Sequence, residues 1–231
     1  VDDLRRNDLA LLAPDLNASE AEFSVEQTDD GWAVRYGLAG LRNVGEKAME
    51  AIVAERERNG RFTSLEDLFA RLPAGAMNRR QLESLAAAGA FESLCPNRAQ
   101  IHGSAELLLA VADAAERERT SGQEALFGGG DDPVPDLRLK DIEDWPRAER
   151  MGHEREVFGF YFSAHPVEAF RSVASAQGAR SYQSLMTSGA PAGGRANAAI
   201  AALVETVRVG QTRRGKDFIR ADFSDSPGQF S

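Results

Sequence analysis

The chain has 231 residues, of which 42% are hydrophobic and 27% are charged, and its formal net charge is -9 with a pI near 5.0. These values are ordinary for a soluble globular protein, and the length allows one large domain or two to three small ones. A negative field of this size repels nucleic acid at long range. Any contact with DNA must therefore be local, made by a few basic side chains or by backbone N–H groups.

Residues with metal-binding or disulfide chemistry are scarce. Cys95 is the single cysteine, which excludes a disulfide framework and a cysteine-based zinc site. The histidines, His102, His153 and His165, are scattered and show no ligand spacing. The longest apolar runs fall short of a membrane span, and the first residues lack the pattern of a secretory signal. We therefore expect a cytoplasmic protein with no membrane partner, no metal site and no cofactor of its own.

The pattern along the chain predicts a mostly α fold. Residues 32–36 alternate between apolar and polar after the turn residues 29–31, which is typical of a short strand. From residue 37 to about residue 94 the pattern is helical with interruptions. Residues 105–119 form a further predicted helix, with one apolar face made by Leu107, Leu108, Val111 and Ala115.

Residues 38–52 resemble a helix-hairpin-helix DNA-binding motif. Asn43 and Gly45 flank the predicted turn, and asparagine is the residue that most readily replaces glycine at a positive φ. Free backbone N–H groups at the start of the second helix would bind a phosphate with little net charge. An ordinary helical hairpin, with Gly45 as a turn residue, is the alternative. The predicted seam is Leu38, Leu41, Val44, Ala48 and Ile52, and the predicted DNA-binding residues are Arg42, Asn43, Val44, Gly45, Glu46 and Lys47.

A second hairpin is predicted over residues 63–89. Thr63 with Glu66, and Asn78 with Gln81, have the spacing of capping boxes that begin helices, and Gly89 is placed to end the second helix. The residues at this second helix start, Asn78, Arg79 and Arg80, again suit a phosphate. Two such hairpins in tandem would hold a duplex across its minor groove through contacts that carry no sequence information.

The rest of the chain alternates between linkers and short elements. Residues 120–135 are rich in glycine, serine, aspartate and proline, and residues 189–197 form a second loose stretch. Between them, residues 145–158 predict a helix with Pro146 near its start. Residues 199–209 and 217–223 predict two strands joined by a basic turn. His165, next to Pro166, is interpreted as a turn-capping or core residue, and Trp32 and Trp145 as packing residues.

Short segments in a fixed order resemble the α subunit of bacterial DNA polymerase III, the replicative C-family polymerase. Together these segments cover nearly the whole chain. They are residues 12–19 (LAPDLNAS), 35–38 (RYGL), 44–48 (VGEKA), 62–65 (FTSL), 78–81 (NRRQ), 87–94 (AAGAFESL) and 159–166 (GFYFSAHP).

The resemblance implies a domain order. It places the end of a fingers region at residues 1–36, a tandem helix-hairpin-helix domain at 37–119, a clamp-binding linker at 120–144, a helical connector at 145–195 and a truncated OB-fold at 196–231. The family's catalytic carboxylates hold two magnesium ions in a palm region that this chain lacks. Mg²⁺ is therefore expected only in the parent protein, and this chain should be inactive alone with no catalytic residue. The adjacent pairs Asp29–Asp30 and Asp131–Asp132 do not converge and are interpreted as solvated.

Residues 123–127 resemble the short peptide by which bacterial polymerases bind the sliding clamp. The predicted clamp-binding residues are Gln123, Glu124, Ala125, Leu126 and Phe127. A glutamine amide would occupy a polar pocket, and Leu126 with Phe127 would contribute roughly 3–6 kcal/mol by filling an apolar cleft. Ordering a free linker offsets part of this, so micromolar affinity is expected. Alternatively, Leu126 and Phe127 continue the apolar face of the preceding helix.

The terminal strands resemble the first hairpin of an OB-fold, a five-stranded barrel that would need more residues than follow here. Arg213, Arg214 and Lys216 could follow a single-stranded backbone, with Phe218 as a stacking platform. A solvated basic turn and a core phenylalanine are the equal alternative. The resemblance implies duplex DNA and the sliding clamp as partners, and adds single-stranded DNA and other polymerase III holoenzyme subunits as candidates. Competing interpretations are a non-enzymatic repair or recombination scaffold, an error-prone polymerase paralogue and a purely structural helical domain.

Overall fold

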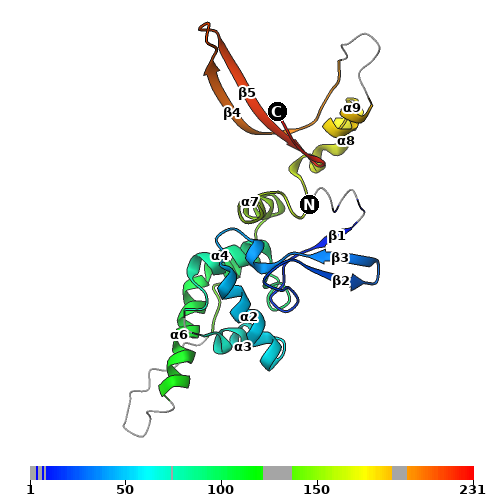
Figure 1. Cartoon of the computed structure of the whole chain (residues 1–231). Coiled ribbons are helices and arrows are strands. Elements are labelled where there is room, and N and C mark those ends of the chain that lie inside the picture. Colours follow the sequence, from blue (N-terminus) through cyan, green and yellow to red (C-terminus); the bar gives the residue numbers. More distant parts are fainter. Residues whose placement is uncertain (1–3, 5–6, 8, 74, 122–136, 189–196) are drawn as a thin grey trace. The chain divides into compact units, whose positions relative to one another are not determined.

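The computed structural model describes residues 4, 7, 9–73, 75–121, 137–188 and 197–231 (Figure 1). It divides the chain into two compact units, one ending at Phe160 and one running from Tyr161 to Ser231. The five-part division expected from the sequence stays a prediction. No helix in the described part of the chain is both long and apolar enough to cross a membrane.

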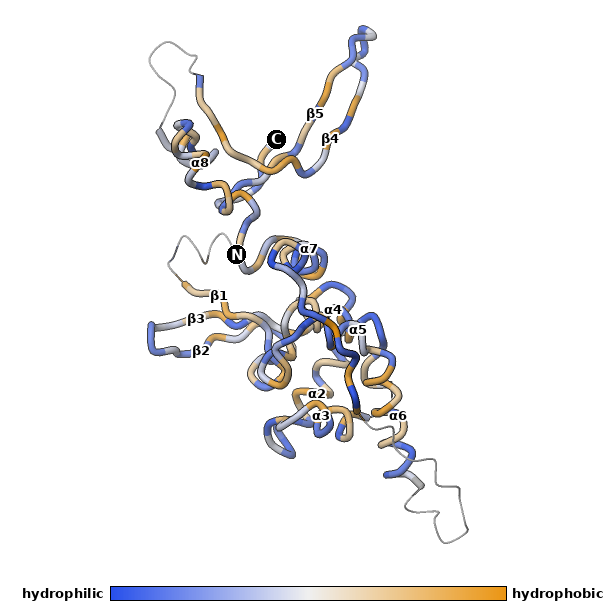
Figure 2. The backbone as a smooth tube through the Cα atoms, turned by 180° about the vertical axis from the view of Figure 1, so that it is seen from behind, coloured by the Kyte–Doolittle hydropathy of each residue, from blue (hydrophilic) through white to orange (hydrophobic). Residues whose placement is uncertain are grey.

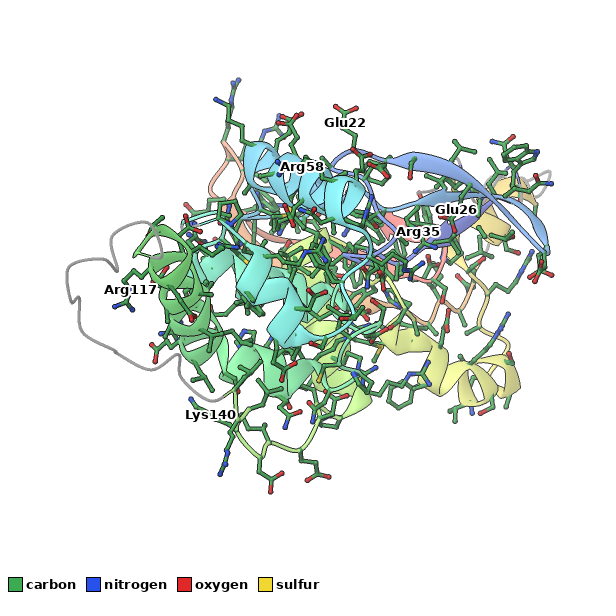
Figure 3. All side chains as sticks on the ribbon, turned by 90° about the horizontal axis from the view of Figure 1, so that it is seen from below. Glu22, Glu26, Arg35, Arg58, Arg117 and Lys140 are labelled. Atoms are coloured by element: carbon green, nitrogen blue, oxygen red, sulfur yellow. The ribbon has the colours of Figure 1, made fainter. Side chains whose placement is uncertain are left out.

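The first unit opens with a small sheet in the order β1-β3-β2. Its strands are β1 (Ala10–Leu12), β2 (Ser24–Thr28) and β3 (Gly31–Arg35), with β1 parallel and β2 antiparallel to β3. Only β3 follows from the sequence pattern. The Arg35 guanidinium binds the Glu26 carboxylate on the neighbouring strand, with Nη2 and Oε1 2.6 Å apart (Figure 3). Trp32 does not pack as expected, because its side chain is 61% exposed.

Helices make up the rest of the first unit. They are η1 (Leu38–Gly40), α2 (Glu46–Asn59), α3 (Leu65–Arg71), α4 (Arg79–Ala88), α5 (Arg98–Gly103), α6 (Ala105–Ser121) and α7 (Arg147–Phe158). The helix predicted at 105–119 is confirmed as α6, and the one predicted at 145–158 as α7, with Pro146 as its N-cap.

The first hairpin differs in one respect from two short helices. Its first arm is a single 3₁₀ turn, η1, and its second arm is the 14-residue helix α2. The seam contains Leu38, Leu41 and Ile52 as predicted, all fully buried. Ala48 is only half-buried, and Met49 takes the buried position instead. Met49 and Ile52 are three residues apart, so they share the helix face that meets the core.

The second hairpin follows its predicted course with one correction. Asn78 and Gln81 form the predicted capping box at the start of α4, and Gly89 ends the helix in the left-handed conformation with φ 83°. The predicted pair Thr63 and Glu66 is wrong by one residue. Ser64 is the N-cap of α3, its hydroxyl accepting from the Asp67 amide at 3.1 Å. The Asp67 carboxylate in turn accepts from the Thr63 amide at 2.9 Å.

Two buried polar side chains connect the segment between β1 and β2 to the hairpins. The Asn17 side chain pairs with the Phe62 backbone, donating to its oxygen at 2.9 Å and accepting from its amide at 2.8 Å. Arg56 on α2 donates to the Leu16 and Ser19 carbonyls at 3.1 and 2.7 Å. Because these groups are buried, each hydrogen bond offsets a desolvation cost that would otherwise count against folding.

The second unit contains short helices and a three-stranded antiparallel sheet in the order β4-β5-β6. The elements are η3 (Pro166–Phe170), α8 (Arg171–Ala176), α9 (Tyr182–Thr187), β4 (Leu203–Gln211), β5 (Asp217–Asp225) and β6 (Gly228–Phe230). The predicted hairpin is therefore present, shifted a few residues toward the C-terminus. The described residues form this sheet and no closed barrel, so the OB-fold stays a prediction.

Candidate nucleic-acid interface

The turn of the first hairpin has the geometry that its sequence predicts. Asn43 has φ 66°, the only positive φ outside glycine among the described residues. Gly45 is the N-cap of α2 in an extended conformation, with φ -86° and ψ 135°, and no side chain caps this helix start. The Val44 amide donates to the Leu41 carbonyl at 3.3 Å, which closes the turn.

Among the described residues, the helix start therefore presents backbone donors that have no partner. The first α2 amide bonded within the helix belongs to Met49, which donates to the Gly45 carbonyl at 3.3 Å. The amides of Glu46, Lys47 and Ala48 precede it, and Gly45, Glu46 and Lys47 are exposed. Such amides, together with the positive end of the helix dipole, make a site suited to an anion.

The two cations of the first hairpin lie in different surroundings. Lys47 is exposed and makes no ion pair with any residue that the structure describes. Arg42 lies against the end of α7, where its backbone amide donates to the Val157 carbonyl at 2.9 Å. Its guanidinium covers Gly159, at which a Cβ would come within 2.7 Å of Nη2. Lys47 is thus the freer of the two for a ligand.

In the second hairpin, other groups of the protein already bind some of the predicted phosphate-binding groups. The Asn78 side chain accepts from the Gln81 amide at 2.9 Å, so one free donor at the start of α4 is taken. Arg79 is held by Glu83, with Nε and Oε1 2.7 Å apart, and by Glu106. Hydrogen bonding to Glu83, with the nearby carboxylate charges, raises the pKa of Arg79. Arg80 is exposed and has no ion pair among the described residues.

An open hollow joins the two hairpins. Sequence reasoning placed Gln81 only in a capping box, and its Oε1 does accept from the Asn78 amide at 2.8 Å. Its Nε2 faces the first hairpin, since a Cβ added to Gly45 would lie 3.2 Å from it. The lining residues are Gly45, Glu46, Lys47, Ala48, Ala51, Pro73, Gly75, Ala76 and Gln81. The structure therefore places the predicted phosphate site of the first hairpin beside Gln81 of α4, while Asn78, Arg79 and Arg80 are not among the lining residues.

The three histidines contact other side chains or backbone groups of the fold. His165 is the N-cap of η3, as interpreted: its Nδ1 accepts from the Val167 amide at 3.2 Å, and its Nε2 lies 2.9 Å from the Ser224 hydroxyl. His102 and His153, distant in sequence, gather around Trp145, whose ring stacks on His153 at 3.9 Å. Burial lowers the pKa of His102, with Glu83 opposing. Within the described part of the chain, no group of three or more ligand-type side chains could hold a metal ion.

The predicted single-strand residues lie on the hairpin of the second unit. Arg213, Arg214 and Lys216 belong to the exposed polar turn between β4 and β5 (Figure 2). Phe218 pairs across the strands with Gly210, and its ring covers that glycine, so that a Cβ there would come within 2.7 Å of the ring. The predicted clamp-binding residues, 123–127, lie outside the described residues.

The hairpins and their exposed helix start are those of a helix-hairpin-helix motif, and a family model described as "Helix-hairpin-helix motif" matches residues 8–101. Three similar curated proteins are each named "DNA polymerase III subunit alpha". The one from Xylella fastidiosa strain Temecula1 is 38% identical over 74% of this chain and 14% of its own length. Those from Caulobacter vibrioides and Vibrio cholerae are 35% and 32% identical over 99% and 93% of this chain, and 19% and 18% of their own lengths.

The chain belongs to the family of bacterial DNA polymerase III α subunits. It spans only 14–19% of the length of these relatives. It therefore corresponds to a segment of such a subunit.

Proposed function

We propose that this chain is the part of a replicative DNA polymerase that holds duplex DNA and connects the enzyme to its sliding clamp. The observation that carries the proposal is the uncapped start of α2 behind the positive-φ Asn43, beside Lys47. Membership of a polymerase family and the helix-hairpin-helix match support it. Polymerisation, with its Mg²⁺ ions, is assigned to other parts of the parent subunit.

The electrostatics are consistent with this role despite the net charge of -9. Free backbone amides recognise a phosphate at short range through directed hydrogen bonds, where a long-range field matters little beyond the Debye length of about 8 Å. Lys47 supplies positive charge in the hollow, and Arg80 supplies it in the first turn of α4. Asn43 and Val44 shape the turn, the backbone amides of Gly45, Glu46 and Lys47 are the proposed phosphate donors, and Asn78 fixes the start of α4. We assign Arg42 and Arg79 a smaller direct role, because the Arg42 guanidinium lies against Gly159 and that of Arg79 is paired with Glu83 and Glu106.

A duplex-binding measurement tests this part of the proposal. Reversing both free cations, Lys47→Glu with Arg80→Glu, should weaken binding of a labelled duplex and lower the salt slope by about 0.9 for each lost phosphate contact. Arg79→Gln is the matched control: it removes a cation of the same helix start that is already ion-paired, so it should change affinity much less. Unchanged affinity and salt slope in the double variant would exclude the hairpins as phosphate sites.

The clamp connection is proposed from residues 123–127 and from the family to which the chain belongs. Leu126→Ala with Phe127→Ala should abolish capture of the chain by an immobilised bacterial sliding clamp. Val134→Ala, in the same linker but outside the peptide, is the control. It is preferred to Leu137→Ala with Leu139→Ser, because those leucines are not matched in position. Undiminished capture of the double variant would remove the clamp from the proposal.

We further propose that the β4–β5 hairpin contacts single-stranded DNA, with Arg213, Arg214, Lys216 and Phe218 as the first candidates. Support comes from the basic turn beside an aromatic ring that keeps 46% of its surface exposed. On the basis of the same family membership, we propose other subunits of the polymerase III holoenzyme as partners and the cytoplasm as the location.

A further inference from the structure

The side-chain amide of Gln81 faces two hairpins at once. Its Oε1 accepts from the Asn78 backbone amide at 2.8 Å, as part of the capping box that begins α4. A backbone N–H can donate only to the oxygen of a side-chain amide, so this contact also fixes which way the group is turned. Nε2 is therefore the end that faces the first hairpin, where a Cβ added to Gly45 would lie 3.2 Å from it.

The Nε2 group is a donor that is held in place but not used. No residue that the structure describes accepts a hydrogen bond from it, whereas Oε1 is bonded to the start of its own helix. The side chain is only partly buried and lines the open hollow, so a ligand can reach it. Because the capping box already orders the side chain, binding through Nε2 loses little rotamer freedom.

The charges that line the hollow offset each other. Glu46 and Lys47 are its two charged lining residues, and they have opposite signs. Apart from Gln81, the other lining residues are glycine, alanine and proline, whose small side chains leave the space open. Attraction for an anion at this place must therefore come mainly from neutral N–H groups. The backbone amides at the start of α2 supply them from one side, and Nε2 of Gln81 supplies one from α4.

We propose that Gln81 is a further phosphate-binding residue, whose Nε2 donates to the same DNA phosphate that the free amides at the start of α2 bind. This inference rests on the duplex contact proposed above and adds a donor from the second hairpin to it. A hydrogen bond to a charged phosphate oxygen is roughly twice as strong as one between neutral groups. Donors from two helices also approach the phosphate from two directions, which fixes the DNA strand more firmly than one helix start does.

Two variants of the full chain test this role by their binding to a labelled duplex. Gln81→Glu keeps an acceptor for the Asn78 amide, since glutamate forms the same capping box, but it loses the donor. Gln81→Met loses both the donor and the acceptor without a change in charge. Each variant should bind the duplex about tenfold more weakly, as expected for one lost hydrogen bond to a charged group. The salt slope of the methionine variant should stay unchanged, because no cation is lost.

The two variants separate three explanations. If Gln81 only stabilised α4, the glutamate variant would bind the duplex normally and only the methionine variant would bind weakly. If only the added charge mattered, the methionine variant would bind normally. Either result would overturn the assignment. Thermal unfolding gives a second measurement: the glutamate variant should melt at or above the temperature of the unaltered chain, because its carboxylate keeps the cap and lies at the positive end of the α4 dipole.

Gln183→Glu is the control for charge. Gln183 is exposed on α9 of the second unit, so the same change in charge there should leave duplex affinity unchanged. The test of Lys47→Glu with Arg80→Glu distinguishes this inference from the proposed function. If that double variant binds weakly while both Gln81 variants bind normally, only the role of Gln81 is excluded. If the unaltered chain binds no duplex, the proposed duplex contact is excluded together with it.

Discussion

At the scale of single residues, the candidate interface depends on what α2 lacks. Most helices begin with a side chain that accepts from a first-turn amide, as Ser64 and Asn78 do for α3 and α4. Gly45 offers no such group, so the amides stay free. A stronger cap would stabilise the helix and occupy the same donors that a phosphate needs. Stability and binding should therefore respond in opposite directions at this position.

Gly45→Asp tests that opposition. The new carboxylate should cap α2 and interact with the helix dipole, raising the free energy of unfolding by about 0.5 kcal/mol over glycine and by about 0.5–2 kcal/mol over alanine, while duplex affinity falls. Gly45→Ala is the matched control, because it adds the Cβ near Gln81 without adding an acceptor. Thermal unfolding and duplex titration on the three proteins measure both effects. If the aspartate variant bound the duplex as well as the alanine variant, the free amides would not be the ligands.

Among the helices of the first unit, a buried ion pair packs against the end of α4. Arg98, at the start of α5, donates to the Glu154 carboxylate of α7 at 2.9 Å and to the Ala87 carbonyl at 3.1 Å. Glu154 is fully buried. The Arg98 guanidinium also covers Gly89, at which a Cβ would come within 2.6 Å of Nη2. Gly89 therefore serves two requirements, a left-handed φ and space for the arginine.

Comparing two glycines separates these requirements. Gly75 has φ 68° with nothing within 4 Å, whereas Gly89 has φ 83° and the Arg98 contact. Gly75→Ala should cost about 1–2 kcal/mol from backbone strain alone. Gly89→Ala should cost clearly more, because Arg98 must also move away from a buried partner. Urea unfolding of both variants measures the difference, and equal losses would show that Arg98 adjusts freely.

The junction of α2 and α3 should govern stability in acid. Burial acts to raise the pKa of Glu55, but hydrogen bonds from Asn59 and Arg71 outweigh it and leave the pKa below its usual value. The Thr63 amide and the Arg71 charge likewise lower the pKa of Asp67 against the effect of burial. A carboxylate with a depressed folded pKa stabilises the protein above its unfolded pKa. That contribution is lost as the pH falls toward the folded value.

Glu55→Gln should therefore reduce the free energy of unfolding at neutral pH by about 1–3 kcal/mol, the usual range for a charged hydrogen bond. Its stability should also fall less steeply than that of the unaltered chain between about pH 5 and pH 3. Glu57→Gln is the control on the same helix, since Glu57 is exposed and makes no ion pair among the described residues. If the Glu55 variant lost stability in acid as steeply as the unaltered chain, the acid dependence would not come from Glu55.

Patterns among neighbouring residues predict most of the fold, but they do not predict contacts between residues that are distant in sequence. The capping box at Asn78, the end of α4 at Gly89 and the positive φ of Asn43 each follow from a few neighbouring residues. The strands β1 and β2 do not, because their pairing with β3 depends on partners elsewhere in the chain. For the same reason, the sequence does not predict the Arg98–Glu154 ion pair or the position of Arg208 opposite Arg220 across β4 and β5. No periodicity marks which charges will meet.

At the scale of the whole molecule, DNA contact and clamp contact should reinforce each other. In sequence, residues 123–127 directly follow α6, which belongs to the unit that carries both hairpins. When the hairpins hold a duplex that already carries a clamp, the peptide meets the clamp at a raised effective concentration. Two weak contacts can then give strong binding without any new interaction. The gain should disappear when either contact is lost.

A comparison of free clamps with clamps loaded on primed DNA measures this gain. The unaltered chain should bind the loaded clamp at least about tenfold more tightly than the free clamp, a modest part of what linked sites can provide. Lys47→Glu with Arg80→Glu should bind the free clamp normally and lose the gain, because its peptide is intact while its hairpins repel phosphate. Leu126→Ala with Phe127→Ala should bind neither form of the clamp specifically, yet retain duplex affinity. A gain that survived loss of the hairpin cations would show that the connection to DNA runs through another surface.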